Sequence, residues 1–95
     1  MIGTSIEVSK KKSGIFLAIV SEVHSGTEHT VELDDEYYRK LTAGRISAEE
    51  LIEKSFYFLL KRESSKSILS RFNLKIIQRY FPEYEQEIME EHDGN

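Results

Sequence analysis

The stretch Ile15-Phe16-Leu17-Ala18-Ile19-Val20 is apolar at every position, and it decides the fold. Several of its residues are β-branched, which favours an extended backbone. Because successive side chains of a strand point to opposite faces, a strand here carries apolar side chains on both faces. Residues 15–20 are therefore predicted to form the central strand of a sheet, with both faces covered.

Strands are also predicted on both sides of residues 15–20. Residues 5–8 and residues 28–34 alternate between apolar and polar side chains, as half-buried strands do. Residues 10–14 and 24–26 contain the glycine and small polar residues of tight turns. The prediction is a three-stranded antiparallel meander with strands at about 4–10, 14–23 and 27–34.

The remainder of the chain is predicted to be helical. Ser47-Ala48-Glu49-Glu50 is a capping box, and apolar residues recur behind it at helical spacing. Asp34 or Asp35 can cap a shorter helix before it, Asn73 can cap a later one, and Pro82 stops that helix. The predicted helices lie at about 35–42, 47–62, 67–72 and 73–81, followed by an acidic tail at 83–95 in which Tyr84 and Ile88 could add one amphipathic turn.

Length and pattern together predict one α+β domain, residues 1–95, with the helices packed on one face of the meander. The apolar run at residues 15–20 is far shorter than the roughly 20 residues of a membrane helix. Residues 1–12 lack the apolar segment of a signal peptide, and the chain has no cysteine for disulfides or thiolate metal sites. We expect a cytoplasmic protein that neither crosses a membrane nor is secreted.

Acidic residues outnumber basic ones, 17 to 13, giving a formal charge of -4. This balance disfavours non-specific attraction to phosphate backbones or anionic lipid. The chain's basic residues still offer one specific alternative. If residues 68–80 were a single helix, Arg71, Lys75 and Arg79 would form a stripe able to follow phosphates, although Asn73 is expected to interrupt that helix. A solvated helix face is the favoured interpretation, and a nucleic-acid-associated regulator is the alternative.

Catalytic and metal-binding patterns are sparse. His24, His29 and His92 lack metal-ligand spacing, and helix capping accounts for the acids at residues 34–36. Neither a phosphate-binding glycine loop nor a nucleophile elbow occurs. We therefore predict no catalytic residue, cofactor or metal. A small enzyme is a second alternative, which would require a pocket that holds His29 beside a carboxylate.

The favoured function is a non-enzymatic protein-interaction or adaptor module. The central strand has two apolar faces, and helices on one side leave the other face to a further chain, most simply a second copy in a homodimer. Aromatic side chains are expected to contribute to a contact surface, although packing would explain at least half of them. The candidate contact residues are Tyr37, Tyr38, Tyr80, Phe81 and Tyr84.

The order of strand, short helix, capping box and long helix over residues 30–63 resembles a ribbon-helix-helix DNA-binding domain. That resemblance implies a strand that pairs with its twin and inserts alternate side chains into the major groove. Here those side chains would be Glu28, Thr30 and Glu32, and phosphate repels the two carboxylates. The topology matches over about a third of the chain, but the chemistry of the strand does not.

A broader resemblance is to a family of short prokaryotic proteins with no established activity. It rests on six short segments spread over residues 35–84, and it implies a self-contained domain without assigning functional residues. The segments are Asp35-Glu36-Tyr37-Tyr38-Arg39-Lys40-Leu41-Thr42, Glu49-Glu50-Leu51-Ile52 with Ser55-Phe56, Phe58-Leu59-Leu60-Lys61-Arg62-Glu63, and Ser67-Ile68-Leu69 with Tyr80-Phe81-Pro82-Glu83-Tyr84.

Overall fold

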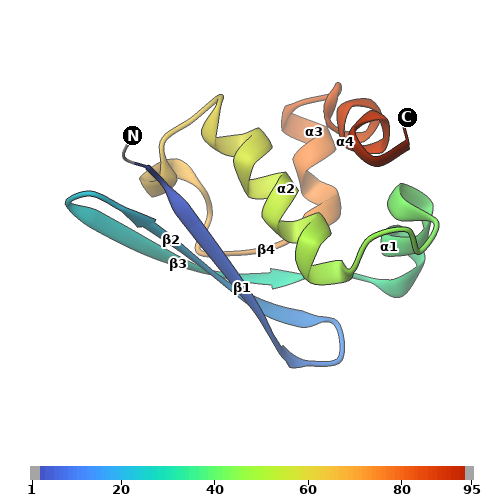
Figure 1. Ribbon diagram of the computed structural model, residues 1–95, viewed down its shortest axis with the longest axis horizontal. Helices are drawn as coiled ribbons and strands as arrows, with labels where there is room; N and C mark the ends of the chain where they lie inside the picture. Colours follow the sequence, from blue (N-terminus) through green and yellow to red (C-terminus); the bar gives the residue numbers. More distant parts are fainter. Residues whose placement is uncertain (1–2, 94–95) are drawn as a thin grey trace.

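A four-stranded sheet with helices on one face forms the framework of the protein, seen in a computed structural model that describes residues 3–93 (Figure 1). The strands lie side by side in the order of the sequence. They are β1 (Ser5–Lys12), β2 (Ile15–Glu22), β3 (Ser25–Glu32) and β4 (Arg71–Asn73). The helices are α1 (Asp35–Thr42), α2 (Ala48–Leu60), α3 (Ile77–Tyr80) and α4 (Tyr84–Asp93), with 3-10 turns η1 (Ser65–Ser67) and η2 (Leu74–Ile76).

The antiparallel meander of β1, β2 and β3 confirms the predicted α+β fold class. Alternate residues of β2 face the helices, and Phe16, Ala18 and Val20 are buried there. The intervening side chains are only half-buried, because the helices lie on one side of the sheet alone (Figure 1). The two faces of β2 are therefore unequal: one belongs to the core and the other is partly open to solvent.

Two helix starts were predicted in the first half of the chain, and both helices form. Ser47 caps α2, since its hydroxyl oxygen accepts a hydrogen bond from the backbone N–H of Glu50 at 3.0 Å. Asp34 precedes α1 but makes no side-chain cap, and its carboxylate instead pairs with Lys75 at 3.2 Å. α1 ends at Thr42, and the next residue, Ala43, adopts a left-handed conformation with φ of 53°.

The helix predicted at residues 67–72 is wrong. Its last residues belong to β4, which pairs in parallel with β3 and places Phe72 beside Val31. The backbone N–H of Thr30 also donates to the carbonyl oxygen of Ser70, 2.8 Å away. Residues 71–73 form a strand because the edge of β3 offers unpaired backbone groups. The local apolar spacing suits a helical turn or a strand equally.

The predicted helix at residues 73–81 begins as η2 and continues as α3. Asn73 caps it as expected, since its side-chain oxygen accepts from the backbone N–H of Lys75 at 3.1 Å. The helix stops just before Pro82 because the residue that precedes proline is disfavoured in helical conformation.

The acidic tail predicted at 83–95 forms the helix α4 over its described part, and this helix packs into the core. Tyr84 and Ile88, one turn apart, are fully buried. A base elsewhere in the chain compensates two of the acids: Arg62, in the turn after α2, pairs with Glu83 at 3.0 Å and with Glu87 at 3.2 Å. The spacing of the apolar residues and the ion pairs together hold α4 against the core despite its many acidic residues.

Candidate functional site

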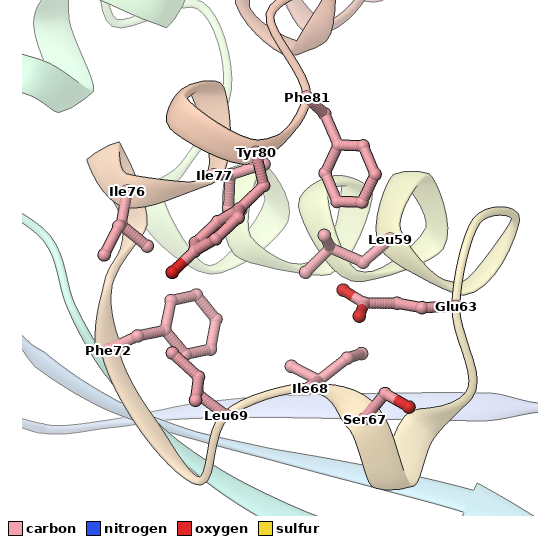
Figure 2. A pocket seen from close by; sticks show the side chains of 10 residues that line it. All are labelled: Leu59, Glu63, Ser67, Ile68, Leu69, Phe72, Ile76, Ile77, Tyr80 and Phe81. Atoms are coloured by element: carbon pink, nitrogen blue, oxygen red, sulfur yellow. The ribbon is translucent and has the colours of Figure 1, made fainter.

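An apolar groove lies between the end of α2 and the segment that runs from η1 through β4 to α3 (Figure 2). Its cavity volume is about 280 Å³. The end of α2 forms one wall and the later segment forms the others, so that residues distant in sequence converge. The lining residues are Leu59, Glu63, Ser67, Ile68, Leu69, Phe72, Ile76, Ile77, Tyr80 and Phe81.

Two side chains at this groove are unusually exposed for their size. Leu69 is 51% exposed and Tyr80 is 66% exposed, whereas their neighbours Ile68 and Phe72 are buried. The carbonyl oxygen of Leu69 lies 2.7 Å from Nδ1 of His29, while the Leu69 side chain stays at the surface. The groove thus combines a packed floor with an apolar rim.

Glu63 is the one charged side chain in the lining. It follows α2, and its backbone N–H donates to the carbonyl oxygen of Leu59 at 2.9 Å. Figure 2 shows its carboxylate between Leu59 and Ile68. Within the described residues 3–93 this half-buried carboxylate has no hydrogen-bond or ion-pair partner.

The neighbouring base, Arg62, is committed elsewhere. Its guanidinium carbon lies 3.6 Å from the centre of the Phe58 ring, and its nitrogens bond to Glu83 and Glu87. Two hydrogen bonds hold the pKa of the Glu83 carboxyl below its usual value. The larger effect comes from the backbone N–H of Glu83 itself, and the second comes from Arg62. Arg62 therefore links the turn after α2 to α4, and it does not pair with its sequence neighbour Glu63.

His29 is buried and fastens β3 to the segment below the groove. Its Nδ1 lies 2.7 Å from the carbonyl oxygen of Leu69, and its Nε2 lies 2.9 Å from the hydroxyl oxygen of Thr27. Because a carbonyl only accepts, Nδ1 carries a proton in this contact. Both ring nitrogens are occupied in this way, and His29 lies against Phe56 rather than beside a carboxylate.

The five aromatic residues predicted at a contact surface do not form one surface. Tyr84 is fully buried, and Tyr37 is buried with its hydroxyl donating to Glu85 at 2.8 Å. Burial raises the pKa of both phenols. Tyr38 is half-buried and donates to the carbonyl oxygen of Ile46, while Tyr80 and Phe81 line the groove.

The three basic residues predicted to form a stripe lie on different elements. Arg71 belongs to β4 and pairs with Glu32 at 2.9 Å, Lys75 belongs to η2 and pairs with Asp34, and Arg79 belongs to α3. The continuous helix on which the stripe depended does not form. β3 also has neighbours on both sides, so it offers no free edge for the pairing of a ribbon-helix-helix dimer.

The helix-free face of the sheet carries one row of half-buried apolar side chains, Ile15, Leu17 and Ile19. Polar residues of the adjacent strands flank this row, with Glu7 and Glu28 on either side of Ile19. The apolar strip is therefore a single strand wide. A second copy on this face stays a prediction.

Within residues 3–93 no group of histidine and acidic side chains is arranged to hold a metal ion. In the same part of the chain, none of the helices has the length and apolar character needed to cross a membrane. Searches against protein-family models, curated proteins and solved structures found no match to this chain.

Sequence reasoning named Tyr80 and Phe81 but missed the rest of the groove, above all Glu63 and Leu69. The groove could not be predicted while residues 67–72 were expected to be helical, because its floor exists only when β4 joins the sheet. The one available signal was Leu69 itself, an apolar residue next to Ile68 in the serine-rich stretch 64–70.

Proposed function

We propose that this protein is a non-enzymatic interaction module and that the groove beside α2 is its binding site for a protein partner. The exposed rim of Leu69 and Tyr80 beside the packed floor is the observation that carries the proposal. Covering these two half-exposed side chains would contribute about 1 kcal/mol each. Such a rim suits the burial of a partner's side chains.

The lining favours binding over catalysis. Glu63 is its one acid, and the hydroxyl of Ser67 is engaged with that of Ser64 at 3.1 Å. His29, the base that an enzymatic interpretation required, lies on β3 with both ring nitrogens occupied. The ion pairs of Arg71 and Lys75 likewise favour a protein partner over a nucleic acid.

Selection from a random peptide display library tests the proposal. The full chain serves as bait, and the double variant Leu69→Ser, Tyr80→Ser serves for counter-selection. We expect peptides that bind the natural chain and lose binding to this variant. Val23 and Tyr57 are also exposed, at 63% and 42%, so the double variant Val23→Ser, Tyr57→Ser is the matched control and should retain binding.

The proposal fails if the selected peptides bind both double variants as well as the natural chain. It also fails if the natural chain selects no peptide, provided that both double variants keep the urea midpoint of the natural chain and all three proteins are therefore folded. Sedimentation of the natural chain tests a homodimer separately, because a dimer formed through the sheet face would weaken in the variant Leu17→Thr.

A further inference from the structure

The carboxylate of Glu63 restricts what can occupy the groove. Its neighbours in Figure 2 are the apolar side chains of Leu59 and Ile68, and Phe81 lies on the same side of the groove. An occupant that covers Glu63 removes water from the carboxylate. Without a replacement donor, that step costs more free energy than burial of one apolar side chain contributes.

Among the described residues 3–93, no cation pairs with Glu63 to supply this donor. Arg62 is held by two other acids and by the ring of Phe58, and Lys54 pairs with Glu91 at 3.5 Å. Lys66 and Arg79 are exposed and lie outside the lining. They would repel a strongly basic partner, which favours an occupant with one basic residue over a polybasic segment.

The dimensions of the groove favour side chains over a cofactor. Its volume of about 280 Å³ is just below the range of about 300–1,000 Å³ that is usual for small-molecule sites. It is apolar at the end lined by Phe72, Ile76 and Tyr80, and acidic at the end occupied by Glu63. One large apolar side chain and one cation match these two ends.

We infer that the groove binds a segment of a partner protein that places an apolar or aromatic side chain near Tyr80 and a single arginine or lysine against Glu63. This inference rests on the proposed function and specifies its partner. A guanidinium or ammonium group replaces the water lost by the carboxylate with charge-assisted hydrogen bonds.

Three capped dipeptides test the charge requirement in NMR titrations of the isotope-labelled full chain. Phenylalanyl-arginine, phenylalanyl-glutamine and phenylalanyl-glutamate share one apolar side chain and differ in the other. We expect the arginine peptide to shift the amide signals of groove residues and to bind about fivefold more tightly than the glutamine peptide, since a hydrogen bond to a charged group is about 1 kcal/mol stronger than a neutral one. The glutamate peptide should bind most weakly.

Variants assign the preference to one carboxylate. Glu63→Gln should make the arginine and glutamine peptides bind equally. Glu53→Gln is the matched control, because Glu53 is another half-buried acid, on α2 and outside the groove lining, and the fivefold preference should persist there.

The possible results separate the inference from the proposed function. Equal binding of all three peptides at the groove overturns the need for a cation but leaves the groove a binding site. A preference for arginine that survives Glu63→Gln overturns the role of Glu63. Groove signals that shift with protein concentration alone overturn the partner assignment, because a second copy then occupies the groove. If no peptide shifts the groove signals, the inference fails, and the display selection decides the proposed function independently.

Discussion

A buried chain of hydrogen bonds between α4 and α2 leads to the most detailed prediction. The hydroxyl of Tyr84 lies 2.6 Å from that of Ser55, and the Ser55 hydroxyl donates to the carbonyl oxygen of Leu51 at 2.8 Å. Because the proton of Ser55 is directed to Leu51, Tyr84 donates to Ser55. Both side chains are fully buried, so water cannot replace either partner.

The two single substitutions should differ in their effect on the free energy of unfolding. Tyr84→Phe removes one donor, while Ser55 still donates to Leu51, and we expect a loss of about 1 kcal/mol. Ser55→Ala leaves the hydroxyl of Tyr84 buried without an acceptor, and we expect a loss of about 2 kcal/mol. The double variant has no stranded hydroxyl, so it should lose only about 1 kcal/mol.

Urea unfolding followed by circular dichroism measures all four proteins of this double-mutant cycle. The expected signature is a double variant more stable than Ser55→Ala alone. Strictly additive losses, about 3 kcal/mol in the double variant, would refute the coupling and with it the buried contact between α4 and α2.

Three further predictions concern α4, the end of α1 and the pH dependence of stability. Ile88→Ala should lower the free energy of unfolding by about 2–5 kcal/mol in urea titrations, because Ile88 is fully buried; a loss as small as that of an exposed site would show that α4 is not docked. Ala43→Gly should raise stability by about 0.5–1 kcal/mol in thermal melts, since the φ of 53° suits glycine; a lower Tm would contradict this. Carbon-detected NMR should show Glu83 titrating below the ordinary value of about 4.3, because its own backbone N–H and then Arg62 lower its pKa. Since the pKa is lower in the folded state, the resulting stability is present above the unfolded pKa and is lost as pH falls through the folded one. Arg62→Gln should raise the Glu83 pKa only part of the way, and no change would exclude the ion pair.

Local signals were sufficient for the first half of the chain. The apolar residues 15–20 identified the central strand, and the capping box at Ser47 located the start of α2, because both features depend on neighbours in sequence. The β3 strand was also found, but its second neighbour was not. The alternation of apolar and polar residues shows that a strand forms and does not show how many strands pair with it.

The second half required tertiary information. Residues 71–73 become a strand only because the edge of β3 is present. The acids of α4 become compatible with packing only because Arg62, 21 residues before Glu83, is positioned to meet them. The groove combines a helix end, a 3-10 turn and a three-residue strand, and no local pattern specifies that combination.

The parallel pairing of β4 with β3 also affects local unfolding of the protein. The long connection through α1 and α2 must close before β4 can dock, and closing a long loop carries an entropic cost that grows with its length. The amide proton that Thr30 donates to Ser70 is consequently a natural reporter for hydrogen exchange. If it exchanges sooner than the amides between β1 and β2, the floor of the groove detaches while the meander remains intact, and ligands would then select among open and closed forms.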